Sequence, residues 1–529
     1  MLIGDLLSRR AGLTPGRPFW REGEDCRTYG QLNADADRVA RALLEAGLRP
    51  GDPVAVCSAN GYAYAAFHFG AAKAGLVLAH LNPRSAAEEL VAAAELCEAR
   101  LIAFGAGQRD LVERVRARLP KAKRWVQLGA DPRDGPAPDW AAEFGDWISA
   151  QRPQGPVFFP GAELRDDQPF QMLFTSGTTG VPKAALISHR AKIAQGVTHA
   201  LNLGLLEGDR ILTSLPLYHQ YAQWLVLVCA PLTGAEVLAR PAFDAGDTWQ
   251  ALQHEGVTHL PCVPTTVYRL LDHPAAGQGR APQLRCIVYG AAPMDARRIR
   301  QLRQRFPRVR LFQGFGQTET GYCLGLHDAD HEVRPESLGK PDLFSEVRLV
   351  DEQGRDVPPG QVGEIVARTP YLMNGYHRDP EATAAYFAYG RDWGRTGDLA
   401  WRDGDGYYRL AGRTKDLIVT GGENVYAAEV ERVLLTHPAV AECAVVGLPH
   451  PDWGEAVHGA VMLRPGQTAD SAGLLAHCRA SLAGFKCPRQ FSFHTEFPRT
   501  ANGKVQKFAL REAMLRDNGT AKPKRGSDT

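Results

Sequence analysis

The chain has 529 residues, a length typical of several compact units rather than one small module. Apolar residues make up 44% and charged residues 23%, a mixture that excludes a chain disordered throughout. The 61 Lys and Arg nearly balance the 59 Asp and Glu, which argues against a dedicated nucleic-acid-binding protein with a concentrated basic face. Ten scattered cysteines, without a Cys-x-x-Cys pair or zinc-type spacing, indicate reduced thiols in a cytoplasmic protein.

Up to about residue 320, short apolar runs alternate with amphipathic segments. The alternation predicts helices at 29–46, 62–74 and 86–97 and strands at 54–56, 76–80 and 101–104. Such a pattern is typical of α/β layers built on largely parallel sheets. The uncharged stretch 211–235 contains Pro216 and His219, so we expect a buried element beside a pocket and no stable membrane insertion.

After about residue 345, shorter strands and turns replace this alternation. Strands predicted at 347–350, 363–367 and 407–410 indicate a small antiparallel or barrel-like unit. Residues 416–515 return to a mixed pattern, with a helix near 427–436, and have the size of a separate C-terminal domain. The polar residues at the end predict a disordered tail.

The strongest local signal is a run of small residues that follows an apolar segment and leads to Lys183. The run is Thr175, Ser176, Gly177, Thr178, Thr179 and Gly180. Its hydroxyl and backbone N–H groups could surround a phosphate, with Lys183 adding positive charge. The spacing is not that of a Walker loop, and on composition alone a plain surface loop is the alternative.

A second segment follows another apolar run and consists of Gln313, Gly314, Phe315, Gly316, Gln317, Thr318 and Glu319. Glycines on both sides of Phe315 would let its ring face a flat ligand such as adenine. Glu319 could hold Mg²⁺, which commonly binds one or two carboxylates together with phosphate oxygens. Taken alone, the segment favours a tight turn that carries a core phenylalanine and a solvated glutamate.

Two further segments carry isolated charged residues. Asp398 follows a glycine in the segment 396–399, and a carboxylate in that position suits a ribose diol because it accepts two hydroxyl hydrogen bonds. Arg413 could complete such a site, although hairpin charges are the simpler explanation. Lys504 follows an Asn-Gly turn and, considered by itself, is a solvated lysine.

In their order and spacing, these four segments resemble the motifs of the adenylate-forming (ANL) superfamily, which includes acyl-CoA synthetases, nonribosomal adenylation domains and beetle luciferases. The resemblance extends from about Thr28 to Lys507 and is closest to bacterial arylcarboxylate–CoA ligases. It implies an α/β fold with a large N-terminal domain of layered sheets, a small β-barrel-like subdomain and a mobile α+β C-terminal domain. The implied boundaries are 1–413 for the ATP- and acid-binding domain, 414–416 for a hinge, 417–515 for the mobile domain and 516–529 for the tail.

The resemblance also implies a reaction. ATP and Mg²⁺ would convert a carboxylic acid into an acyl-AMP with release of pyrophosphate, and coenzyme A would then accept the acyl group and release AMP. One alternative is a stand-alone enzyme that loads an acyl carrier protein; another is a non-catalytic nucleotide-binding protein. No nucleic-acid partner is expected, and a homodimer is a candidate assembly.

Residue roles follow from the same resemblance. Phosphate contacts fall to Thr175–Gly180, Lys183 and Thr318, adenine contacts to Gly290, Ala291, Ala292, Gln313, Gly314, Phe315 and Gly316, ribose contacts to Asp398 and Arg413, and magnesium to Glu319. Lys504 would bridge the substrate carboxylate and the α-phosphate. The residues assigned to catalysis are Lys504, Glu319, Thr318, His219 and Lys183.

The C-terminal domain would swing about Lys415 between the two half-reactions and withdraw Lys504. Gly421 and Gly422 would then leave room for the pantetheine arm of coenzyme A, because glycine has no side chain. Trp453 and Phe485 lie in segments that resemble the coenzyme A side of arylcarboxylate–CoA ligases.

His219 lies where the resemblance places an aromatic or histidine gate beside the substrate carboxylate. Gln220 stands where amino-acid-activating relatives usually have Asp, which argues against an α-amino acid. The predicted acid pocket is lined by Tyr221, Ala222, Trp224, Tyr289 and Tyr322. These pocket segments contain no Lys or Arg to pair with a second carboxylate, so we predict a hydrophobic aryl or short-to-medium acyl acid.

Overall fold

The computed structural model describes residues 1–129, 136–151, 164–176, 182–277, 279–292, 294–390, 392–499 and 505–520. Contacts within the chain divide it into two compact units. The first unit comprises Met1–Val347 and Val366–Thr396, and the second comprises Arg348–Ile365 and Gly397–Thr529. All ten cysteines are free thiols, as predicted.

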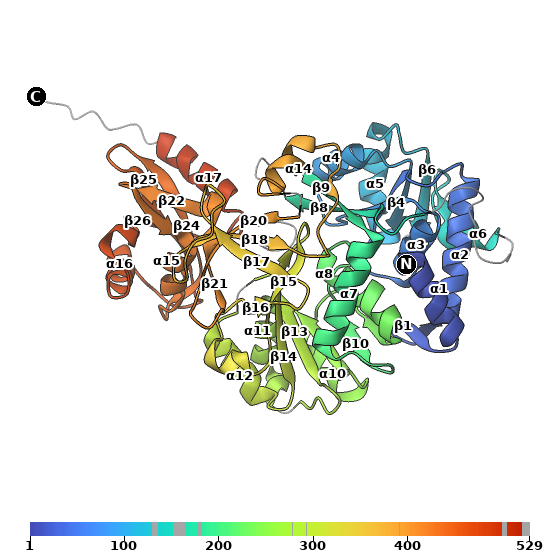
Figure 1. Ribbon diagram of the computed structural model, residues 1–529, viewed down its shortest axis with the longest axis horizontal. Helices are drawn as coiled ribbons and strands as arrows, with labels where there is room; N and C mark the ends of the chain where they lie inside the picture. The colour runs from blue at the N-terminus through green and yellow to red at the C-terminus, as the bar shows by residue number, and fades with distance from the viewer. Residues whose placement is uncertain are drawn as a thin grey trace, which may run out of the picture. The chain divides into compact units, whose positions relative to one another are not determined.

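One sheet of the first unit runs in the order β16-β15-β14-β13-β12-β10-β11-β1-β2 (Figure 1). Its strands are β1 (Pro18–Glu22), β2 (Asp25–Thr28), β10 (Arg210–Thr213), β11 (Glu236–Ala239), β12 (His259–Cys262), β13 (Cys286–Gly290), β14 (Arg310–Gln317), β15 (Gly321–Leu326) and β16 (Lys340–Pro341). The strands from β11 through β10, β12 and β13 to β14 pair in parallel. Their carboxyl ends therefore meet at one edge of the sheet, where open α/β sheets usually bind ligands.

The other sheet of this unit has the order β19-β9-β8-β4-β3-β5-β6-β7. Its strands are β3 (Pro53–Cys57), β4 (Val77–Leu81), β5 (Leu101–Gly105), β6 (Arg124–Leu128), β7 (Ala142–Glu143), β8 (Pro169–Ser176), β9 (Pro182–Ser188) and β19 (Gly375–Tyr376). β4 pairs in parallel with β3 and β8, whereas β9 is antiparallel to both β8 and β19. The last residues of β8 and the first residues of β9 thus lie side by side.

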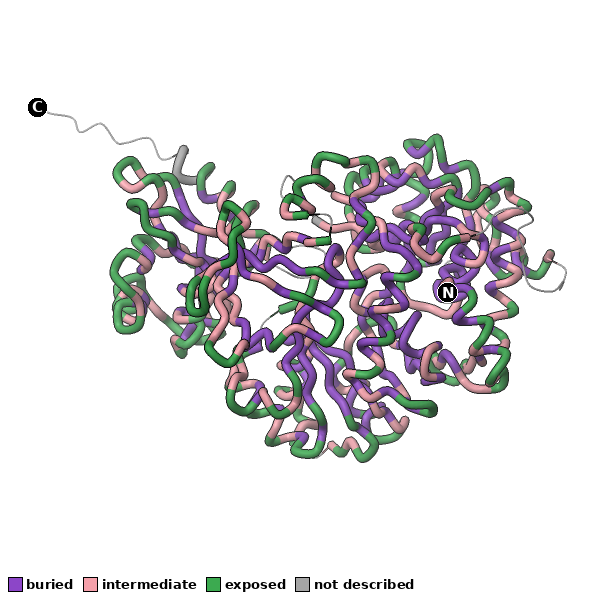
Figure 2. Tube along the Cα trace, in the orientation of Figure 1, coloured by how far each residue is buried: buried purple, intermediate pink, exposed green. Residues whose placement is uncertain are grey.

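Helices pack against both sheets, and most residues of the central strands are buried (Figure 2). They are α1 (Ile3–Leu13), α2 (Tyr29–Glu45), α3 (Tyr62–Lys73), α4 (Ala87–Cys97), α5 (Arg109–Val115), α6 (Phe144–Ser149), α7 (His189–Leu203), α8 (Gln220–Gln223), α9 (Ala230–Thr233), α10 (Ala245–His254), α11 (Pro264–Asp272), α12 (Ala296–Arg305), α13 (Asp330–Val333) and α14 (Pro380–Tyr386). The helix predicted at 29–46 is confirmed as α2, and a capping box fixes its start because the Thr28 hydroxyl accepts from the Gln31 N–H. The alternation seen in the sequence therefore predicted the α/β fold correctly.

The uncharged stretch 211–235 folds into β10, α8, the π-helix η3 (Trp224–Cys229) and α9. Every residue of η3 is buried in the core of the first unit. Gly196 of α7 lets η3 approach closely, because a Cβ at this position would lie 2.4 Å from Val228. Across the described ranges, no helix is long and apolar enough to cross a membrane.

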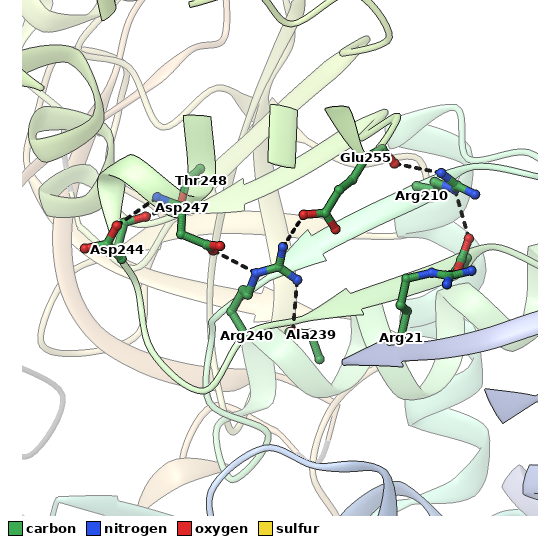
Figure 3. A network of polar contacts seen from close by, with 9 residues as sticks. Arg21, Arg210, Ala239, Arg240, Asp244, Asp247, Thr248 and Glu255 are labelled. Atoms are coloured by element: carbon green, nitrogen blue, oxygen red, sulfur yellow. Dashed lines mark hydrogen bonds and ion pairs between the residues drawn. The ribbon is translucent and has the colours of Figure 1, made fainter. Parts of the chain in front are cut away.

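A chain of ion pairs holds the loop after β11 to helix α10. Arg240 pairs with Asp247 at 2.7 Å and with Glu255 at 2.5 Å (Figure 3). Arg210, at the start of β10, donates to the Glu255 carbonyl at 2.8 Å. These contacts anchor α10 to β10 and to the loop after β11, and β10 lies next to β12, one of the strands whose carboxyl ends define the ligand edge.

A further sheet, β17-β18-β20-β21, contains β17 (Glu346–Val350), β18 (Gly363–Arg368), β20 (Gly394–Arg402) and β21 (Tyr408–Arg413). The C-terminal part of the second unit contains β22 (Leu417–Thr420), β23 (Glu423–Tyr426), β24 (Val440–His450), β25 (Gly454–Leu463) and β26 (Gln490–Phe493), with α15 (Ala427–Leu435), α16 (Ser471–Arg479) and α17 (Lys507–Thr520). Helix α17 includes residues 516–520, which the sequence analysis had assigned to the tail. The remaining tail residues lie outside the described ranges.

Candidate active site

Glu319 is the centre of a polar corner in the first unit. Only 8% of its surface is exposed, and its Oε1 accepts hydrogen bonds from the Thr175 hydroxyl at 3.1 Å and from the Tyr376 hydroxyl at 2.8 Å. Lys183 pairs with Thr175 in register across β8 and β9, and its Nζ lies 5.1 Å from the centre of the Tyr376 ring. The structure therefore brings together three residues that the sequence predicted for ATP and magnesium: Thr175, Lys183 and Glu319.

The chemistry of this corner fits a magnesium ion that is shared with phosphate. Burial, and then the neighbouring Glu319 carboxylate, raise the pKa of the Tyr376 hydroxyl, so Tyr376 stays protonated and donates to Glu319. A carboxylate has more acceptor sites than these two donors use. The described ranges contain no cluster of three His, Cys, Asp or Glu side chains that could hold a metal by themselves. One well-oriented carboxylate beside a phosphate site is what Mg²⁺ commonly uses.

Part of the predicted phosphate loop cannot be placed. Ser176 ends β8, and only its backbone is described. Gly177, Thr178, Thr179 and Gly180 lie outside the described residues, as does Lys504. Their roles stay predictions.

Glycines shape the predicted adenine edge. Gly290, the last residue of β13, pairs in register with Gly314 within β14, and a Cβ on Gly290 would lie 2.7 Å from the Gly314 carbonyl oxygen. Ala291 follows with φ of +68°, in the left-handed region that costs a non-glycine residue about 1–2 kcal/mol. Both Ala291 and Ala292 are exposed. Strain at a turn beside parallel strand ends is typical of a ligand-binding position.

Phe315 and Gly316 continue this edge along β14. Phe315 is half-buried, and Gly316 is exposed. A Cβ on Gly316 would lie 1.9 Å from the Gly321 carbonyl oxygen, so only glycine fits there. Thr318 is half-buried and adjoins Glu319 in the turn between β14 and β15.

Gln313 and Tyr289 form a buried hydrogen-bonded chain. The Tyr289 hydroxyl donates to Gln313 Oε1 at 3.2 Å and lies 3.0 Å from His331 Nε2. Tyr289 packs in a core cluster with residues such as Trp249, on the opposite face of the sheet from its strand neighbour Val288. The structure therefore does not bring Tyr289 to the other predicted pocket residues, because successive side chains of a strand point to opposite faces.

His219 and Gln220 join helix α8 to the segment that carries Glu319. His219 precedes α8 and its Nδ1 accepts from the Tyr221 N–H at 3.3 Å. Gln220 is buried and donates to the Gln317 carbonyl at 3.2 Å. Gln220, the residue after the predicted gate His219, thus lies in direct contact with the predicted adenine and magnesium segment.

The other four predicted pocket residues share one core cluster of the first unit: Tyr221, Ala222, Trp224 and Tyr322. Trp224 stacks on Tyr221, with ring centroids 5.5 Å apart, and on His199 of α7, at 3.6 Å. The His199 ring also lies 4.7 Å from the Tyr322 ring. We call Tyr221, Trp224, Tyr322 and His199 the aromatic cluster.

Within the second unit, Asp398 and Arg413, the two residues assigned to ribose in the sequence, form an ion pair. They face each other across β20 and β21, and Arg413 Nε donates to Asp398 Oδ1 at 2.8 Å. Asp398 is only 3% exposed, whereas the Arg413 side chain reaches the surface. Lys415 is exposed in the short helix η5 (Thr414–Asp416).

Gly421 and Gly422 form the turn between β22 and β23, with φ of +59° and +83°. The Gly421 N–H donates to the Trp453 carbonyl at 2.9 Å. Gly421 and Trp453, both predicted to contact coenzyme A, are therefore in direct contact. Trp453 itself is stacked by His450, with ring centroids 4.1 Å apart. Phe485 lies in the short helix η6 (Gly484–Lys486) and is 37% exposed.

Two residues of the site were missed in the sequence. Tyr376, which holds Glu319, lies far from it along the chain and ends a strand of only two residues, so no local pattern marks it. His199 is one of several polar residues on the buried face of α7, and only the fold shows that it stacks between Trp224 and Tyr322.

Known proteins share both units. The family model described as AMP-binding enzyme matches residues 7–377, and that described as AMP-binding enzyme C-terminal domain matches residues 429–504. Feruloyl-CoA synthase of Amycolatopsis sp is 34% identical over 512 residues, covering 96% of this chain and 98% of that protein. Indoleacetate–CoA ligase of Aromatoleum aromaticum is 34% identical over 528 residues, covering 98% and 99%. The crystal structure of the anthranilate CoA ligase AuaEII with anthranoyl-AMP aligns with a TM-score of 0.87 at 28% identity, covering 98% of each chain.

The fold and these matches define an adenylate-forming acid–CoA ligase, which confirms the class predicted from the sequence. The chain belongs to the AMP-binding enzyme family, with both its main domain and its C-terminal domain.

Proposed function

We propose that the protein uses ATP to join a hydrophobic aryl carboxylic acid to coenzyme A through an acyl-AMP intermediate. The observation that supports this most strongly is the polar corner of Thr175, Lys183, Glu319 and Tyr376, which collects three chain segments around one oriented carboxylate. The close match to CoA ligases over nearly the whole chain supports the same reaction.

In the first half-reaction, a carboxylate oxygen of the acid attacks the α-phosphorus of ATP, the bond to the β-phosphate breaks, and pyrophosphate leaves. Bound Mg²⁺, held by Glu319 and phosphate oxygens, would neutralise phosphate charge. Thr175 and Lys183 bind the β- and γ-phosphates, and Thr318 contacts the α-phosphate. Lys504 would bridge the acid and the α-phosphate, where its charge matters most as pyrophosphate departs.

In the second half-reaction, the thiol sulfur of coenzyme A attacks the acyl carbon, AMP leaves, and the thiol proton passes to solvent. Rotation at Lys415 withdraws Lys504 and presents the turn at Gly421 and Gly422 to the pantetheine arm. Trp453 and Phe485 flank the coenzyme A path. Asp398 and Arg413 bind the ribose of the nucleotide.

The aromatic cluster supports an aryl acid as the substrate. Tyr221 and Trp224 present parallel rings, and Tyr322 and His199 extend the same group. Stacked aromatic side chains gain about 0.5–1.5 kcal/mol per ring pair beyond area burial, which favours a flat substrate. Three of the matched proteins are named for feruloyl, indoleacetate and anthranilate, and each of these acyl groups contains an aromatic ring.

The test is product formation from a panel of aryl, alicyclic and fatty acids with ATP, Mg²⁺ and either free coenzyme A or an acyl carrier protein. We expect acyl-CoA and AMP from aryl acids with free coenzyme A. Thioester formed only on the carrier protein would instead favour the carrier-loading alternative, and failure with every acid would refute the proposal.

A further inference from the structure

Lys192 of α7 is buried in the first unit beside a group of uncharged polar side chains. Its exposed fraction is 1%, and those of His68 on α3, His80 on β4 and Gln171 on β8 are 2%, 1% and 0%. We call these four residues the Lys192 cluster. None of them has a role in the mechanism proposed above.

The polar atoms of this cluster lack protein partners. Within the described ranges, no hydrogen bond of ordinary geometry reaches Lys192 Nζ, His68 Nδ1, His80 Nε2 or either polar atom of the Gln171 amide, although Gln171 lies close enough to His80 to raise the pKa of that imidazole. Buried polar groups are satisfied in the great majority of cases, by protein or by ordered water. So many unsatisfied atoms on neighbouring elements therefore point to a bound species.

Ring contacts and electrostatics show that the members lie together. The His68 and His80 rings are 5.5 Å apart, and His68 also meets Phe170, which stacks on His189 at the start of α7. The Lys192 ammonium lowers the pKa of both His68 and His80, after the larger effect of burial. The cluster thus spans the space between β4, β8, α3 and α7.

Nearly every group that faces this space is a donor. The Tyr64 hydroxyl lies 2.6 Å from His80 Nδ1, and in the tautomer in which this hydroxyl donates, the imidazole proton is on Nε2. Lys192 offers three N–H donors and Gln171 two, with the Gln171 oxygen as the one acceptor of that pair. Among the described residues, no carboxylate acts on Lys192, and burial lowers the pKa of its ammonium to about 7.

Lys73 of α3 shows what a buried lysine ordinarily has. Its Nζ pairs with Asp37 at 2.6 Å and donates to Asn33 at 2.7 Å. Lys192 is more deeply buried than Lys73 and has no such carboxylate in the described part of the chain. A buried ammonium without a counter-charge is costly, and an anion beside it would remove that cost.

We propose that the Lys192 cluster is a binding site for a small monovalent anion of the halide class, held by Lys192 Nζ, His80 Nε2 and the Gln171 amide. Three secondary-structure elements, α7, β4 and β8, supply the ligands, so the bound ion ties α7 to the sheet that carries Thr175. This site lies apart from the residues assigned to ATP and does not rest on the proposed reaction.

Thermal unfolding with bromide as the probe tests the proposal. The full chain is unfolded in sodium bromide and in sodium gluconate at equal ionic strength, since gluconate is too large for an enclosed site. We expect bromide to raise the unfolding midpoint by about 1–3 °C over gluconate in the wild type and not in Lys192→Met. Lys73→Met is the matched control and should keep the bromide effect.

A crystal of the wild-type protein soaked in bromide provides a second measurement that needs no variant. The proposal predicts an anomalous scattering peak beside Lys192 Nζ. Water alone in the cluster, or the far end of a bound acid in the same place, would refute the anion site. An equal response of the wild type and Lys192→Met to bromide would refute it as well.

Discussion

The orientation of Glu319 depends on two neighbours that come from separate strands. Thr175 closes β8, Tyr376 closes β19, and both donate to the same carboxylate oxygen. Donors fixed on rigid strands keep the other oxygen in a constant orientation. Residues that orient a metal ligand in this way commonly change metal affinity by 10–100-fold.

The Tyr376 hydroxyl can be removed without a change of size. We expect Tyr376→Phe to raise the Mg²⁺ concentration needed for half-maximal activity by about 10-fold, because Glu319 loses its shorter hydrogen bond. The measurement is a Mg²⁺ titration of acid-dependent pyrophosphate exchange. Tyr371→Phe, which removes a hydroxyl bonded to Thr198, is the control, and an equal shift in both variants would contradict this role.

The lowered pKa of the buried Lys192 predicts that the stability of the protein depends on pH. Its folded pKa of about 7 lies below the usual 10.5, so above pH 7 the unfolded chain binds more protons at this group and stability rises with pH. His68 and His199, with pKa values of about 3, do not titrate in this window, and burial raises the pKa of Cys229 above it.

In gluconate, the free energy of unfolding of the wild type should therefore rise by about 2 kcal/mol relative to Lys192→Met between pH 7 and pH 9. Denaturant unfolding at the two pH values measures this difference. If the free energies of unfolding of the wild type and Lys192→Met differ by the same amount at pH 7 and at pH 9, the lowered pKa of Lys192 is contradicted.

Elements of the fold could be predicted where the hydrophobic period is strong. The amphipathic segment 29–46 and the apolar run 101–104 correspond closely to α2 and β5. Tyr289 shows the limit, because its nearness in sequence to Gly290 suggested the pocket, whereas the alternation of β13 turns its ring to the other face. The π-helix η3 carries no sequence signal beyond its lack of charge.

The site was predictable only in part for the same physical reason. Thr175, Lys183 and Glu319 lie in local runs of unusual composition, and the structure places them together. Tyr376 and His199 act through contacts between elements far apart in the chain, and no local pattern encodes such contacts.

The hairpin β14–β15 depends more on Gly316 than on Gly314, two residues earlier in β14. A methyl group at Gly316 would meet the Gly321 backbone at 1.9 Å, whereas one at Gly314 would touch Tyr322 at an ordinary 3.5 Å. We expect Gly316→Ala to lower the free energy of unfolding by about 3 kcal/mol and Gly314→Ala by less than about 1 kcal/mol. Denaturant unfolding measures both, and equal effects would contradict the close approach of the two strands.

At the scale of the whole molecule, the proposed mechanism requires the C-terminal domain to take two positions. Lys415 is exposed in η5, between the strand that carries Arg413 and the C-terminal strands, so a change there alters backbone freedom without opening a core. Proline fixes φ and removes the N–H group, which would restrict a hinge.

Lys415→Pro should therefore spare acyl-AMP formation and reduce thioester formation at least 10-fold. Lys415→Ala, which keeps the backbone free, is the matched control and should be nearly neutral. Single-turnover measurement of each half-reaction separates the two steps. Unimpaired thioester formation in the proline variant would rule out a hinge at this position.

The central claim is that the Glu319 corner activates an acid on ATP before any thiol takes part. Exchange of labelled pyrophosphate into ATP, measured with an aryl acid and without coenzyme A, tests this directly. The account predicts acid-dependent exchange in the wild type and a loss of at least about 100-fold in Glu319→Gln. Absence of exchange with every acid, or undiminished exchange in Glu319→Gln, would contradict it.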